Sequence, residues 1–117
     1  MKQFILKLID KAKNSWCGLK KIWCSEWAFR VELIAFLIAI PCTFYVGKSA
    51  MEYALLISSV LFIIIIEIIN TAIETTVNRI GLEYHELSGL AKDLGALAIL
   101  MSIINALLIW SIIFFIK

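Results

Sequence analysis

Polar side chains recur at helical spacing in the most apolar part of this chain. Glu67 interrupts a run of isoleucines, and Asn70, Glu74 and Asn78 follow it at intervals of three, four and four residues. These spacings place the four side chains on one face of a helix. A charged side chain at the centre of a membrane-spanning helix costs about 2.5–3.5 kcal/mol on insertion scales, so such a position indicates function. Glu67 and Glu74 are about 10 Å apart along a helix axis, which suits two separate roles.

The same face can instead be a packing seam, because intramembrane polar side chains often hold helix bundles together. A second polar set favours chemistry. It comprises Glu26, Arg30 and Glu32 before one apolar segment, and Glu83, His85, Glu86, Lys92 and Asp93 before another. Carboxylates and a lysine suit Mg²⁺ held jointly by protein and nucleotide phosphates. Taken alone, a loop histidine such as His85 is more typical of a helix cap than of a ligand.

The composition indicates where these residues must lie. Of the 117 residues, 62% are hydrophobic and 17% are charged, against roughly half and a quarter in soluble domains. A small soluble domain keeps much of its surface exposed and could not bury that much apolar side chain. The sequence therefore predicts an all-α membrane protein and excludes a disordered chain, a secreted disulfide scaffold and a large two-domain enzyme.

The apolar segments predict one membrane domain over residues 1–117. Three stretches lack charge, 33–47, 53–66 and 94–116, and only the third reaches the roughly 20 residues that a spanning helix needs. The second must carry Glu67 and Asn70 to reach that length. We expect spanning helices at about 29–47, 51–78 and 92–116. In residues 4–24 the apolar side chains recur at helical spacing and lysines fill other positions, which predicts an amphipathic helix on the membrane surface.

Basic residues predict the orientation. Residues 1–30 carry a net charge of +5, the first loop has Lys48 alone, and the second loop has Arg79 and Lys92. The positive-inside rule places the N-terminus and the second loop in the cytoplasm and the C-terminus outside. The basic start suits anionic lipid headgroups, and we expect no nucleic-acid partner.

Three blocks resemble the prokaryotic diacylglycerol kinase family of small integral-membrane lipid kinases. They are Glu67 to Glu74 (EIINTAIE), Glu83 to Gly89 (EYHELSG) and Ala91 to Asp93 (AKD), and Glu26 to Arg30 (EWAFR) is also similar. The resemblance implies a homotrimer in the bacterial cytoplasmic (inner) membrane with active sites shared between chains. It implies Mg²⁺-dependent transfer of the ATP γ-phosphate to diacylglycerol, giving phosphatidate for lipid recycling. Residues 91–95 are more similar to the diacylglycerol-using branch than to the undecaprenol kinases.

The resemblance also assigns roles position by position. Glu67 is the expected general base on the lipid hydroxyl, Asn70 supports it, and Glu26 and Glu74 hold Mg²⁺ with the phosphates. The expected ATP-binding residues are Lys7, Glu26, Glu74, Glu83, Tyr84, His85, Lys92 and Asp93. The expected lipid-binding residues are Lys7, Ser15, Trp16, Ala28, Phe29, Arg30, Val31, Glu32, Glu67 and Trp110.

Four positions depart from the family pattern. Lys7 and Leu90 stand where arginine is common, Asn14 where an aromatic residue is common, and Asn78 where relatives have aspartate. Lys7 keeps the charge but loses bidentate phosphate geometry. The glutamates expected to act in catalysis are unchanged. An undecaprenol kinase and a non-enzymatic membrane helix-bundle subunit or small transporter remain the alternatives.

Overall fold

The protein is helical almost throughout, in a computed structural model that describes residues 1–116. The four helices are α1 (Lys2–Ser25), α2 (Trp27–Val46), α3 (Ala50–Ile80) and α4 (Glu86–Phe115). Helices α2, α3 and α4 are long and apolar enough to cross a membrane. The predicted all-α architecture, with one amphipathic helix before three spanning helices, is confirmed.

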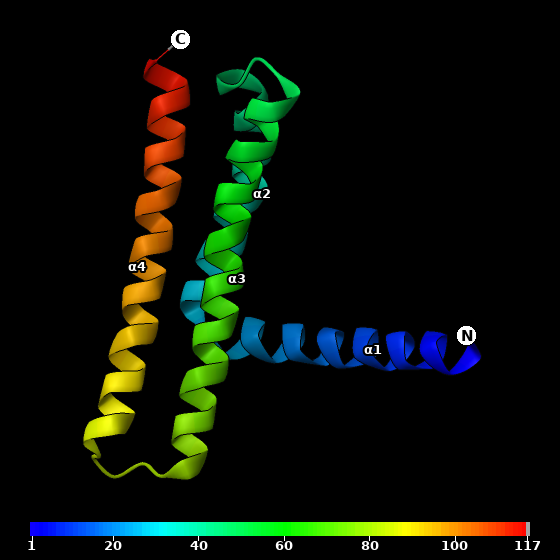
Figure 1. The fold of residues 1–117 in the computed structure, drawn as a ribbon, viewed down its shortest axis with the longest axis vertical. Coiled ribbons are helices and arrows are strands. Elements are labelled where there is room, and N and C mark those ends of the chain that lie inside the picture. Colours follow the sequence, from blue (N-terminus) through cyan, green and yellow to red (C-terminus); the bar gives the residue numbers. More distant parts are fainter. Residues whose placement is uncertain (117) are drawn as a thin grey trace.

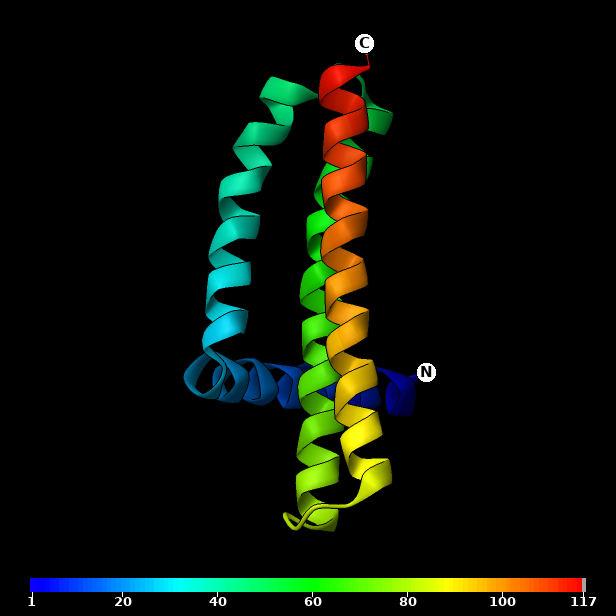
Figure 2. The same cartoon turned by 90° about the vertical axis from the view of Figure 1, so that its left-hand side faces the viewer.

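Helix α1 runs across the bundle, whereas α2, α3 and α4 lie side by side along its length (Figures 1 and 2). The chain bends at Glu26, which adopts an extended conformation with φ −113° and ψ 106°. Within α1, Ile22 is the one buried residue. A helix that leaves its apolar stripe uncovered by protein is suited to lie in the membrane interface.

A small apolar core fixes this elbow. Ile22 from α1, Phe29 from α2 and Ile64 from α3 are buried together, with Leu33 and Phe36 packed against them. Phe29 is only 1% exposed. The first two helices are thereby attached to α3 one turn before Glu67, so the elbow sets which α2 residues can approach that carboxylate.

Local capping defines the two remaining connections. Ser49 accepts a hydrogen bond from the Glu52 backbone N–H at 3.2 Å and begins α3. His85 caps α4, because its Nδ1 atom accepts from the Leu87 N–H at 3.1 Å. Helix α4 therefore begins at Glu86, whereas the apolar pattern places the spanning segment from about residue 92. The added turns extend α4 beyond the apolar segment and carry Lys92 and Asp93 on a helix rather than in a loop.

Candidate active site

The polar seam of α3 faces the interior of the bundle. Glu67 and Asn70 are 5% and 6% exposed, and Asn70 Nδ2 donates a hydrogen bond to Glu74 Oε1 at 3.2 Å. Helix α4 packs along α3 (Figure 2), and its backbone at Gly95 lies against the Asn70 side chain. The orientation follows from the energetics, because a carboxylate turned toward lipid tails would have no polar partner.

Carboxylates from three elements converge on Glu67. Its charge interacts with those of Glu26, at the α1–α2 bend, and Glu74, on α3. It also interacts with the charge of Glu32 on α2. The Glu32 Oε2 atom is buried and has no hydrogen-bond partner within the described residues. Like charges brought together away from water repel one another, so this cluster is built to receive positive charge.

The cluster is suited to a metal that arrives with phosphate. Among residues 1–116, no three side chains of histidine, cysteine, aspartate or glutamate come close enough to hold a metal by themselves. Mg²⁺ is commonly held by one or two carboxylates together with waters and substrate phosphates. Glu26 and Glu74, which both interact with Glu67, offer such a pair. The donor set therefore fits Mg²⁺ bound with a nucleotide and does not fit an all-protein metal cage.

Five of the eight residues predicted to bind nucleotide lie at one end of the α3–α4 hairpin. Glu83, Tyr84, His85, Lys92 and Asp93 are all exposed there. The Lys92 ammonium group donates to Asn78 Oδ1 at 3.0 Å and links the two helices. His85 has the capping role that a lone loop histidine predicts. Along α3, Glu74 lies about 6 Å from Asn78 and about 10 Å from Glu67, so it stands between this exposed end and the buried carboxylate.

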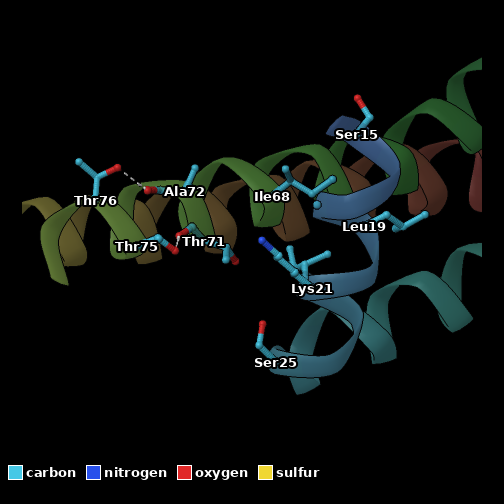
Figure 3. Close-up of a pocket in the computed structure, with 11 residues that line it drawn as sticks. Ser15, Leu19, Lys21, Ser25, Ile68, Thr71, Ala72, Thr75 and Thr76 are labelled. Carbon is cyan, nitrogen blue, oxygen red and sulfur yellow. Dashed lines mark hydrogen bonds between the residues drawn. The ribbon is translucent and has the colours of Figure 1, made fainter. Parts of the chain in front are cut away.

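A groove lies between α1 and α3, where it is lined by α3 residues between Ile68 and Thr76. It has a volume of ≈ 640 Å³, within the range of small-molecule sites. Figure 3 shows α1 residues such as Lys21 and Ser25 lying across from a threonine-rich stretch of α3. The Thr71 hydroxyl is buried and has no hydrogen-bond partner among residues 1–116. It stands four residues after Glu67, about one helical turn along α3, and Glu67 itself does not line the groove.

The remaining residues predicted to bind lipid are dispersed. Ser15 lines the groove, but Trp16 lies in an adjacent apolar depression, where the Lys20 ammonium group sits 5.3 Å from its ring. Trp110 lies deeper, where its Nε1–H donates to Ser59 Oγ at 3.1 Å. Ser59 precedes Glu67 by about 12 Å along α3.

Residues 28–32 and Lys7, which were also predicted to bind lipid, lie in different surroundings. Phe29 is packed in the core and Val31 is exposed. Ala28, Arg30 and Glu32 are half-buried. Lys7 is exposed on α1 and does not line the groove. This segment therefore supplies Glu32 to the carboxylate cluster and Phe29 to the elbow.

The residues that sequence reasoning missed are Lys21, Ser25 and Thr71 in the groove and Gly95 on α4. Gly95 is buried, and a Cβ atom added there would collide with Asn70 Oδ1. That oxygen has no hydrogen-bond partner within the described residues. Because the amide is also bonded to Glu74, it cannot turn aside without losing that contact. The close approach of the α4 backbone thus holds Asn70 in place. The one signal in the sequence was the nearness of Gly95 to the Ala91–Asp93 block.

Replacing Gly95 by alanine is expected to lower ATP turnover in mixed micelles by about tenfold, since a displacement of 1 Å at a reacting site can cost about 10²-fold. The matched control is Gly89→Ala, because an added Cβ there meets nothing within 4 Å. In an Asn70→Ala background, Gly95→Ala should cause no additional loss. A further loss in that background would show that the glycine acts through something other than Asn70.

Comparison with known proteins identifies the family. A family profile described as prokaryotic diacylglycerol kinase matches residues 13–114. The chain is 48% identical to a diacylglycerol kinase of Escherichia coli (strain K12) over 106 residues, covering 91% of this chain and 87% of that protein. It is 44% identical to the Haemophilus influenzae diacylglycerol kinase over 108 residues, covering 92% of each chain. Given these matches and the polar face of α3, with Glu67 and Asn70 buried and Glu74 bonded to Asn70, the chain belongs to the prokaryotic diacylglycerol kinase family.

Proposed function

We propose that this protein is a membrane lipid kinase that transfers the γ-phosphoryl group of ATP to the free hydroxyl of diacylglycerol, giving phosphatidate for lipid recycling. The observation that carries this proposal is Glu67, a carboxylate buried in a membrane-spanning helix amid three other glutamates. A packing seam needs hydrogen bonds, but it gains nothing from a buried glutamate that three other glutamates repel. Membership of the family supports the same reaction.

In the proposed reaction, the Glu67 carboxylate lies next to the lipid hydroxyl. As the hydroxyl oxygen forms its bond to the γ-phosphorus, the bond from that phosphorus to the β–γ bridging oxygen breaks and ADP leaves. Glu67 accepts the hydroxyl proton. Asn70, held between Glu74 and the α4 backbone, keeps this part of α3 in register. Phosphoryl transfer depends mainly on positioning and on neutralising phosphate charge, and these residues supply the positioning.

Glu26 and Glu74 would hold Mg²⁺ together with the nucleotide phosphates. When bound, the cation neutralises charge on the transferring phosphoryl group. Glu67 and its neighbouring glutamates would then repel one another less. Residues at the exposed end of the α3–α4 hairpin would bind the nucleotide, with Lys92 meeting phosphate as a point charge. The groove between α1 and α3 would receive the glycerol end of the lipid.

The proposed setting is the bacterial cytoplasmic membrane, with the N-terminus and the 81–85 connection in the cytoplasm. Helix α1 and that connection lie toward the same end of the bundle (Figure 1), and α1 carries most of the basic residues. Assembly as a homotrimer with shared active sites completes the proposal. The exposed end of the hairpin leaves room for a neighbouring chain to contribute to the nucleotide site.

The experiment that tests the proposed function is a panel of lipid alcohols in mixed micelles with labelled ATP and Mg²⁺. Diacylglycerol should be phosphorylated much faster than undecaprenol, because residues 91–95 resemble the diacylglycerol-using branch. Faster phosphorylation of undecaprenol would reassign the substrate. ATP consumption that no lipid alcohol stimulates would favour the non-enzymatic helix bundle.

Glu67→Gln is expected to lower diacylglycerol phosphorylation by about 10²–10⁴-fold, because an amide cannot accept the hydroxyl proton. Circular dichroism and size in detergent should be unchanged, since glutamine has nearly the same shape. Glu52→Gln is the matched control, because Glu52 lies on the same helix at its first turn. Turnover close to wild type in purified Glu67→Gln would remove the base assignment.

Glu74→Ala is expected to raise the Mg²⁺ concentration for half-maximal activity by about tenfold, the smaller end of the range for groups that support a bound metal. Alanine also removes the acceptor for Asn70, so Glu74→Gln is the informative partner, since its amide oxygen can still accept that bond. A metal-binding carboxylate predicts a shifted magnesium titration in both variants. A normal titration in Glu74→Gln would mean that Glu74 only supports Asn70.

A further inference from the structure

A polar side chain is exposed at the middle of α4. Asn105 lies at the centre of the charge-free run from Leu94 to Ile116, about 16 Å along the helix from either end. Its side chain is exposed, and within the described residues 1–116 it forms no hydrogen bond. The hydrocarbon core of a bilayer is about 30 Å thick, so Asn105 lies near its midplane. Lipid tails offer no partner to an amide at that depth.

The surroundings of Asn105 form a shallow groove made by α3 and α4 alone. It has a volume of ≈ 350 Å³ and is lined by Ser58, Ser59 and Phe62 from α3 and by Asn105 and Ile109 from α4. Ser58 is exposed, and its hydroxyl bonds only to the Leu55 carbonyl of its own helix, at 3.2 Å. Helix α2 lines a different groove, on the side of Trp110. This face of the hairpin is therefore uncovered by the rest of the chain.

We propose that a second copy of this chain packs on this groove and that Asn105 forms hydrogen bonds across the contact, with the Asn105 or Ser58 side chain of the neighbouring copy. A carboxamide is both donor and acceptor, so the same residue on two related copies can supply both partners. Small side chains such as serine let helices approach closely in membranes, and asparagine side chains bond between helices there. Closed symmetric assemblies bring equivalent surfaces of identical chains together.

The contact differs from the carboxylate cluster in place and in purpose. Ser59, which lines the same groove as Asn105, lies about 12 Å from Glu67 along α3. Asn105 therefore takes no part in the proposed reaction. The contact gives the proposed homotrimer a specific interface and requires no assumption about catalysis, so its failure would leave the proposed phosphoryl transfer untouched.

Cysteine cross-linking in lipid vesicles tests the contact. The three native cysteines, Cys17, Cys24 and Cys42, are free and are first replaced, Cys17 and Cys24 by serine and Cys42 by alanine. Copies carrying Asn105→Cys are reconstituted alone, and also mixed with differently tagged copies carrying Ser58→Cys, and both samples are oxidised. The control is Leu107→Cys, because Leu107 is 63% exposed and lies on the opposite side of α4 at the same depth.

Disulfides require Cα atoms within about 7 Å of each other. We expect dimers linked through position 105, or between positions 105 and 58, and at least about tenfold less product at position 107. Equal cross-linking at 105 and 107, or none at 105 in either sample, would overturn the proposal. Helical content measured by circular dichroism identifies the samples in which the chain is folded.

A second measurement does not depend on cysteine. Energy transfer between labelled copies, followed as vesicles are diluted with lipid, reports dissociation. Asn105→Leu should weaken association about threefold for each hydrogen bond lost, which corresponds to about 0.6 kcal/mol. The control variant Leu107→Met should associate as the parent protein does. Unchanged or stronger association of Asn105→Leu would contradict a bond across the contact.

Discussion

A carboxylate kept away from water needs polar surroundings supplied by the protein, and the structure of this chain depends on that requirement at Glu67. Helix α3 satisfies its own backbone hydrogen bonds throughout the membrane. It turns its polar face toward α4, whose backbone comes close enough at Gly95 to confine Asn70. The elbow core of Ile22, Phe29 and Ile64 then brings α2 to the other side. The helices thus enclose the acidic seam while their apolar faces meet lipid.

The enclosed charges remain unbalanced in the chain by itself. The charges of Glu26, Glu32 and Glu74 each interact with that of Glu67, and all of these carboxylate charges are negative. This repulsion favours a ligand that brings positive charge with it, as the proposed magnesium nucleotide would. The polar residues of α3 are also ordered from the apolar segment toward the exposed hairpin end. In the proposed reaction, that order would give the lipid hydroxyl and the phosphates opposite directions of approach to one helix face.

Features that depend on local spacing could be predicted from the sequence, and features that depend on helix packing could not. The apolar segments predicted the spanning helices, and the interval from Glu67 to Glu74 predicted a shared inward face. The His85 cap, a local feature that the sequence indicated, sets the start of α4, whereas hydropathy alone predicted a later start. The convergence of Glu26 and Glu32 on Glu67 requires the bend between α1 and α2. Likewise, the importance of Gly95 is visible only when α4 lies against Asn70.

The open side of the groove between α1 and α3 has a consequence for how a substrate is supplied. One wall of the groove belongs to α1 (Figure 3). With that amphipathic helix in the membrane interface, as its sequence pattern predicts, a lipid would reach the groove by lateral diffusion within a single leaflet. Its effective concentration is then a mole fraction of the membrane, independent of the volume of surrounding water. Adding inert phospholipid would dilute such a substrate as effectively as adding buffer dilutes a soluble one. Turnover would consequently report the composition of the leaflet in which the protein resides.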